Sequence, residues 1–175
     1  MRRPLVVLAV LMVAMTTFAR PVLAQNQVSL GFYPSIFDSF HEDEVGIGFR
    51  GPWGRRVTPN PTIAGQVRDL TWSWTGEIRI GHEWGGGSVF EVLGGLRASN
   101  DTLLKWPCFA DLKVGIIHFP GQNRPIIHPS VGFEFPNAGR NFNWWASVGA
   151  PIVFFNGVNE IGLEGGIGLS FGMKR

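Results

Sequence analysis

The sequence predicts an all-β protein, an eight-stranded antiparallel up-and-down transmembrane β-barrel. Three observations carry this prediction. Large apolar residues alternate with small or polar ones in eight segments, as they do when successive side chains point to opposite faces of a strand. Helical periodicity is nearly absent, and 24 glycines and 12 prolines disfavour helices. Beyond residue 24, no apolar run approaches the roughly 18 residues of a membrane helix, so a closed sheet is the remaining way to cross a bilayer.

The alternating segments differ in length and clarity. The first two are short, and the third is long, with Trp72 and Trp74 facing one way and Glu77 and Arg79 the other. The last is the clearest. From Ile161 to Met173, nearly every odd-numbered residue is large and apolar, whereas the even-numbered residues are glycine, Ser170 and Glu164. In chain order the segments cover residues 28–32, 45–49, 70–80, 90–97, 110–116, 131–135, 144–152 and 161–173.

The connections between these segments have turn composition. Tight turns are expected at Gly85–Gly87, Phe119–Asn123, Pro136–Gly139 and Asn156–Gly157, and longer links at Gly51–Asp69 and Ala98–Pro107. Gly85–Gly87 precedes no helical pattern, so it is interpreted as a turn and not as a phosphate-binding loop. The connections predict one meander without a linker or a second domain.

The first 24 residues have the pattern of a cleaved secretory signal peptide. Arg2 and Arg3 precede the apolar run Leu5–Ala14, and Val22–Ala24 ends in the small residue that a signal peptidase requires. We therefore expect residues 1–24 to be the signal and residues 25–175 to be the barrel domain. The signal holds three of the 15 basic residues and none of the 13 acidic ones, which leaves 12 bases against 13 acids. This balance and the lack of a basic stripe argue against nucleic-acid binding.

The size of the residues on the two faces predicts which face meets lipid. An eight-stranded barrel has an interior just wide enough for side chains. The bulky apolar face does not fit there, whereas the face of glycine, serine, threonine and a few charges does. Only 16% of the residues are charged, few for a surface in water. We therefore expect the apolar face to point into lipid, with an interfacial belt formed by Trp72, Trp74, Trp84, Trp106, Trp144 and Trp145. A soluble lipocalin-like secreted barrel is the alternative.

The charged residues on the other face predict a polar network in the lumen. Acids and bases are mixed, so they can pair across a narrow interior and fill it, and a small-solute pore is the alternative. The expected members are Arg50, Glu77, Arg79, Glu91, Arg97, Asp111, Lys113, Glu134 and Glu164.

The acidic run His41–Glu44 is interpreted as a solvated loop and not as a metal site. Neighbouring side chains in an extended segment point to opposite sides, which separates potential ligands. Cys108 is the single cysteine and cannot form an intrachain disulfide. The sequence therefore predicts no metal site and no cofactor.

Residues Ala110–Gly115, Phe119–Pro120, Arg124–Ile127 and Val131–Phe133 resemble a strand–turn–strand unit of small outer-membrane barrels of the OmpA/OmpX/OmpW type. The resemblance implies an outer-membrane location, contact with lipid and lipopolysaccharide, assembly by the barrel-assembly machinery, and a monomer. It also implies long loops at the end opposite the chain termini. The longer links of this chain are instead the second and fourth connections, which belong to the end with the termini.

His128 and Ser130 lie two residues apart on one strand face, where an imidazole can activate a hydroxyl. This His-Xaa-Ser spacing resembles the dyad of outer-membrane lipid A deacylases, which implies an enzyme as an alternative function. Pro129 separates the pair, and the predicted orientation points both side chains into the lumen. The preferred interpretation is a non-enzymatic barrel with a structural or interaction role.

Overall fold

The computed structural model describes residues 27–52, 70–84, 86–100, 107–136, 142–155 and 157–172. The expected signal peptide and Trp106 of the expected tryptophan belt lie outside these ranges. The regular structure of the described residues consists of strands, and they contain no helix long and apolar enough to cross a membrane. The strands are β1 (Gln27–Ile36), β2 (His41–Pro52), β3 (Leu70–Glu83), β4 (Gly87–Asn100), β5 (Cys108–Phe119), β6 (Gln122–Pro136), β7 (Phe142–Gly149), β8 (Ile152–Phe154), β9 (Asn159–Ile161) and β10 (Leu163–Gly172).

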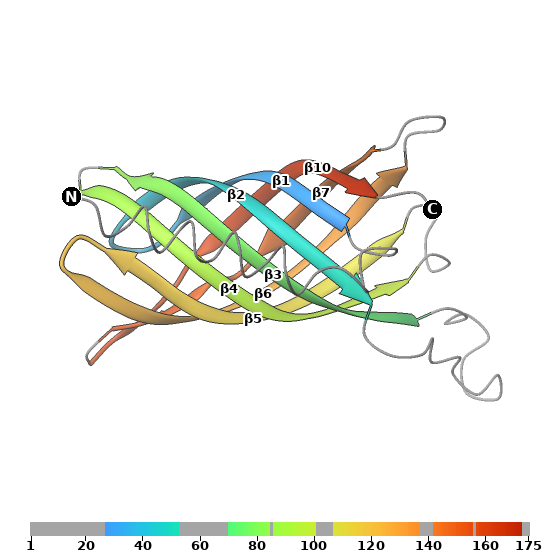
Figure 1. Cartoon of the computed structure of the whole chain (residues 1–175). Helices are drawn as coiled ribbons and strands as arrows, with labels where there is room; N and C mark the ends of the chain where they lie inside the picture. The colour runs from blue at the N-terminus through green and yellow to red at the C-terminus, as the bar shows by residue number, and fades with distance from the viewer. Residues whose placement is uncertain are drawn as a thin grey trace, which may run out of the picture.

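These strands close into an eight-stranded antiparallel barrel (Figure 1). The order β5-β4-β3-β2-β1-β10-β7-β6 is completed by pairing of β5 with β6, so every spanning strand has two neighbours. β7 and β8 form one spanning strand, and β9 and β10 form another. The predicted fold class is confirmed. Closure matters in lipid because an open edge would leave backbone groups without hydrogen-bond partners.

The last two spanning strands are each interrupted at one point. Ala150–Pro151 separates β7 from β8, and Gly162 separates β9 from β10, where the sequence predicted continuous strands. Proline lacks the N–H that a strand interior needs, which explains the first break. A hydrogen bond from Gly162 N to Pro151 O (2.8 Å) joins the two interruptions.

Beyond these breaks, β8 and β9 form a hairpin that is attached to the barrel on one side. β8 pairs with β6, whereas β9 has no strand partner other than β8 in the described sheet. Past the end of β1, the hydroxyl of Ser39 lies 2.6 and 2.7 Å from the two carboxylate oxygens of Glu160 in β9. The hairpin is therefore held on this side by a side-chain contact.

The two ends of the barrel differ in their connections. The turn end carries four short connections, at residues 37–40, 84–86, 120–121 and 155–158. Pro120–Gly121 suits a type II turn, in which glycine supplies the positive φ, here 86°. This turn is tighter than the expected Phe119–Asn123, because β6 begins at Gln122. The terminal end carries Gln27, Gly172 and the connections 53–69, 101–107 and 137–141, so the longer links share an end with the described termini.

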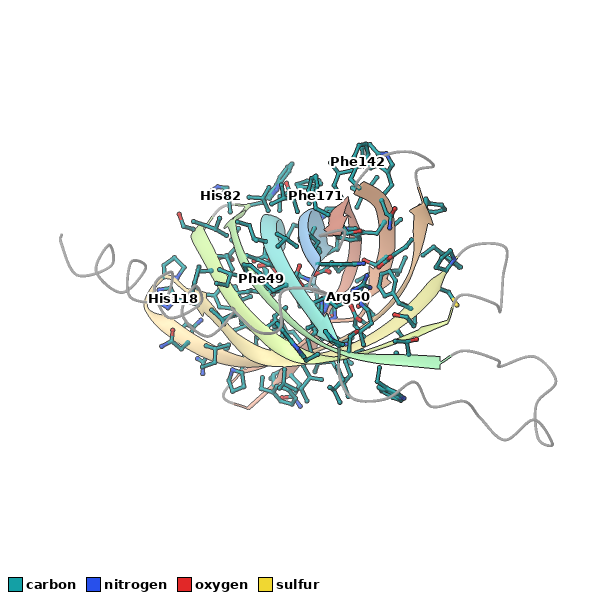
Figure 2. The ribbon with its side chains drawn as sticks, turned by 45° about the vertical axis from the view of Figure 1, so that its right-hand side comes forward. Phe49, Arg50, His82, His118, Phe142 and Phe171 are labelled. Carbon is teal, nitrogen blue, oxygen red and sulfur yellow. The ribbon has the colours of Figure 1, made fainter. Side chains whose placement is uncertain are left out.

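The outer surface is apolar along the middle of the strands. Leu112, Val114 and Ile116 of β5 are more than half exposed, and the other strands present similar residues (Figure 2). Of the expected tryptophan belt, Trp72, Trp74, Trp84 and Trp144 are exposed. Trp145 is an exception, and its assignment to the belt is wrong. Its ring is buried in the lumen, with its centroid 5.6 Å from that of Tyr33, because the alternation on β7 turns it inward.

A charge introduced on the outer surface at the middle of a strand tests whether this surface faces lipid. We expect Val114→Lys to destabilise the barrel in phospholipid vesicles by about 2–4 kcal/mol, because the ammonium would face the bilayer centre. Val158→Lys at the turn end is the control and should cost about 0–1 kcal/mol. Urea unfolding from vesicles measures both. Equal effects of the two substitutions would contradict the lipid-facing orientation.

Candidate functional site: the charged lumen

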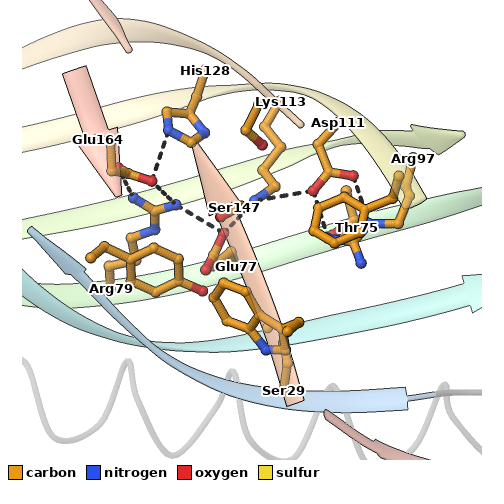
Figure 3. Close-up of a pocket in the computed structure, with 15 residues that line it drawn as sticks. Ser29, Thr75, Glu77, Arg79, Arg97, Asp111, Lys113, His128, Ser147 and Glu164 are labelled. Atoms are coloured by element: carbon orange, nitrogen blue, oxygen red, sulfur yellow. Dashed lines mark hydrogen bonds and ion pairs between the residues drawn. The ribbon is translucent and has the colours of Figure 1, made fainter. Parts of the chain in front are cut away.

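Arg79 of β3 is the centre of an ion-pair network inside the barrel. Its side chain is 1% exposed, and its guanidinium lies 2.6 Å from Glu164 of β10 and 3.2 Å from Glu77 (Figure 3). Weaker approaches of 3.4 and 3.5 Å reach Glu44 of β2 and Glu91 of β4. One cation is thus shared by four carboxylates from four strands. A buried charge is tolerated only with such partners.

The network continues from Glu77 toward the terminal end of the barrel. Lys113 Nζ lies 2.6 Å from Glu77 Oε2 and 3.7 Å from Asp111. Arg97 donates two hydrogen bonds of 2.6 Å to the carboxylate oxygens of Asp111, a bidentate geometry that is specific to arginine. Figure 3 shows this succession of alternating charges.

Glu134 of β6 ends the succession and joins opposite walls of the barrel. It lies 3.3 Å from Arg97 of β4 and 2.6 Å from Arg50 of β2, which also donates a hydrogen bond to Gln27. The structure therefore places all nine residues of the expected lumen set inside the barrel and joins them through ion pairs. We use "lumen network" for these nine residues together with Glu44 and His128.

Aromatic rings support the arginines of the lumen network. The Arg79 guanidinium lies 3.7 Å from the centroid of the Tyr33 ring, and that of Arg97 lies 3.7 Å from the centroid of Phe109. Such cation–π contacts add to the ion pairs when the groups are desolvated. A cavity of about 30 Å³ remains among these side chains, room for about two water molecules. The lumen is therefore filled at this level.

A second, apolar layer fills the lumen at the turn end. The Phe37 and Phe40 rings stack with centroids 4.2 Å apart, and Phe40 meets Phe119 edge-on at 5.2 Å. This layer was not predicted, because its members are apolar residues on the face that is polar elsewhere. We call it the apolar plug, and it consists of Phe37, Phe40, Val89, Leu93, Ile117, Phe119, Ile126 and Val153, with Phe155 packed against them.

The interpretation of His41–Glu44 as a solvated loop is wrong for its two glutamates. β2 begins at His41, so Glu42 and Glu44 share the inward face and are 2% and 1% exposed. They meet Glu91 of β4, which lies between the plug residues Val89 and Leu93 on the inward face of that strand. Glu42 and Glu44 have the i, i+2 spacing of residues on one strand face. The predicted strand began at residue 45, so the two glutamates were assigned to the preceding loop.

The candidate dyad also lies inside the barrel. His128 and Ser130 are both buried on the inward face of β6, as the alternation predicted. Nε2 of His128 lies 3.0 Å from Oε1 of Glu164. No hydrogen bond of the described residues joins an imidazole nitrogen to the Ser130 hydroxyl. The imidazole is thus positioned toward Glu164 of the lumen network.

At the terminal end, the lumen widens into a hollow of about 400 Å³. Arg50 and Glu134 lie at its lining together with Trp72, Cys108 and Phe109. This volume falls in the range of small-molecule sites, about 300–1,000 Å³. The hollow and the lumen network share Arg50 and Glu134.

Comparison with known proteins identifies the fold. No protein-family model matches the sequence, and no curated protein matches it. Among solved structures, the outer membrane enzyme PagL superposes with a TM-score of 0.55 at 11% sequence identity, covering 83% of this chain and 99% of PagL. Neisserial surface protein A (NspA) gives 0.55 at 7% identity, covering 85% of this chain and 96% of NspA. The chain has the fold of small outer-membrane β-barrels.

These likenesses do not single out the OmpA/OmpX/OmpW group within that kind of barrel. One of the two neighbours is described as an enzyme and the other as a surface protein. The shared fold is therefore compatible with different activities, which depend on the residues of each site.

The central position of Arg79 can be tested by removing its charge. We expect Arg79→Gln to destabilise the folded barrel by about 3–5 kcal/mol, because it leaves buried carboxylates without their shared cation. Arg124→Gln at the turn end is the control, with an expected cost of about 1 kcal/mol or less. In urea titrations, Arg79→Gln combined with Glu164→Gln should be less destabilised than the sum of the two single variants. Strict additivity would show that the pair does not interact.

Proposed function

We propose that the protein is an integral outer-membrane β-barrel with a structural or interaction role and a closed lumen. The observation that carries this proposal is the filling of the lumen by two successive layers, the lumen network and the apolar plug. A conducting barrel needs a continuous aqueous path, and barrels with such channels have many more strands. In this chain about 30 Å³ of free volume remains within the network.

The proposed location is the outer membrane of a Gram-negative cell, reached by means of a cleaved signal peptide. The apolar outer surface and the shared fold support it, and the outward position of the large residues disfavours a lipocalin-like secreted barrel. The implied partners are outer-membrane lipid, lipopolysaccharide and the barrel-assembly machinery. We propose a monomer, because closure of β5 on β6 leaves an unpaired sheet edge only at the three-residue strand β9 in the described part of the barrel.

Planar-bilayer recordings test the closed lumen. We expect the refolded wild-type barrel to produce no discrete conductance steps, with a porin in the same bilayers as the positive control. The double variant Phe37→Ala/Phe40→Ala should also be silent, because the lumen network remains behind the weakened plug. Discrete steps from folded wild-type protein would contradict the proposal in favour of a small-solute pore.

A lipid A deacylase assay tests the proposal that the barrel is not an enzyme. We expect no fatty-acid release from lipopolysaccharide, because His128 and Ser130 face the filled lumen and not the lipid. Release of fatty acid that disappears in Ser130→Ala and persists in Ser147→Ala would overturn this expectation. Ser147 is the matched control, because it lines the same small cavity.

A further inference from the structure

Three buried glutamates of the lumen each have an oxygen without a hydrogen-bond partner. Glu42, Glu44 and Glu91 are 1–2% exposed, and one carboxylate oxygen of each lies within 4.8 Å of the other two. The oxygens without a hydrogen-bond partner are Oε2 of Glu42, Oε1 of Glu44 and Oε2 of Glu91, of which the last lies 3.5 Å from the Arg79 guanidinium. Three ionised carboxylates in this arrangement repel one another and are shielded from water, so they require either the positive charge of a compensating cation or bound protons.

Arg79 does not supply enough of that charge. Its closest contacts are to Glu164 and Glu77, and it reaches Glu44 and Glu91 only at 3.4 and 3.5 Å. Glu42 forms no ion pair in the described structure, although it points toward the other two carboxylates. Glu42, the glutamate of the cluster without a cationic partner among the described residues, therefore points toward the other two carboxylates.

The charges of the lumen as a whole are unbalanced in the same direction. The lumen network and Glu42 contain seven carboxylates, from Glu42, Glu44, Glu77, Glu91, Asp111, Glu134 and Glu164, against four arginine or lysine side chains, from Arg50, Arg79, Arg97 and Lys113. The other four carboxylates each lie 2.6 Å from one of these cations. The excess negative charge is therefore localised at the three glutamates.

We propose that Glu42, Glu44 and Glu91 bind one divalent metal cation, for which Ca²⁺ is the best match. Ca²⁺ takes oxygen ligands at about 2.3–2.6 Å, so one ion spans oxygens that lie up to about 5 Å apart. Mg²⁺ requires a smaller, near-octahedral shell at about 2.0–2.1 Å and retains water more strongly. Three carboxylates at the border of an apolar layer favour the larger and geometrically more tolerant ion.

The backbones of β2 and β3 approach closely beside one of the proposed ligands. Gly81 is paired with Glu44 across these strands, and a Cβ atom at position 81 would clash with the carbonyl oxygen of Asp43 and lie 2.6 Å from Cγ of Glu44. A larger residue there would therefore displace the β2 backbone that positions Glu44. The site goes beyond the proposed function, because a bound cation would stabilise the barrel whether or not it conducts.

The test uses the full barrel domain refolded in detergent and dialysed against EDTA. We expect isothermal titration to detect one Ca²⁺ per barrel, and Ca²⁺ to raise the unfolding temperature in a concentration-dependent way. Glu42→Gln and Glu91→Gln should each weaken Ca²⁺ binding tenfold or more. The matched control is Glu160→Gln, which removes a carboxylate from the same end outside the cluster and should leave binding unchanged.

Without metal, the cluster variants should be more stable than wild type. In EDTA, Glu42→Gln and Glu91→Gln should unfold at a higher temperature than wild type, because each removes one of three repelling carboxylates. The proposal is overturned if Ca²⁺ neither binds to wild type nor shifts its unfolding temperature. Greater stability of both variants in EDTA would then identify shared protons as the compensation. It is also overturned if Glu160→Gln weakens binding as much as the cluster variants do. Conductance plays no part in these readouts, so failure of the closed-lumen proposal would be seen separately.

Discussion

The narrow interior of an eight-stranded barrel is the constraint on which the rest of this structure depends. Closure satisfies the backbone in lipid, but it leaves an interior that must be filled by the inward half of each strand. This chain fills it with arginine, lysine and carboxylates in the middle and with aromatic and aliphatic groups at the turn end. The charged groups in the middle of the barrel are then far from bulk water, so their positions are determined by the charges on the facing strands. Arg79 is central because four strands direct a carboxylate toward it.

Much of this arrangement could be predicted from the period-two alternation. It identified the strands, the outward-facing side and the nine charged residues that the structure joins in the lumen. The size difference between the two faces was sufficient to orient the sheet, because a whole face of Trp, Leu and Ile does not fit inside while a face rich in Gly and Ser does. These inferences need only local sequence, in which each residue's face follows from its neighbours.

Features that depend on register and on strand ends were not predicted. The meeting of Glu42 and Glu44 with Glu91 depends on where β2 begins and on the positions of β2 and β4 on either side of β3. Trp145 was assigned to the wrong side because Trp144 and Trp145 are adjacent, and only one of two consecutive residues can face lipid. The apolar plug escaped detection because inward apolar residues near a turn lack the pattern that identifies the rest of the lumen.

The β8–β9 hairpin gives the barrel wall a local weakness with a consequence for its interior. The hairpin follows the interruptions at Ala150–Pro151 and Gly162, and on the side of β1 it is held by the contact between Ser39 and Glu160 instead of a backbone ladder. It also carries Val153 and Phe155, which belong to the apolar layer or pack against it. Local opening follows the least secured hydrogen bonds of a structure. An outward movement of this hairpin would therefore remove Val153 and Phe155 from the apolar plug and open the barrel interior at the turn end. The other strands of the barrel would keep their pairing.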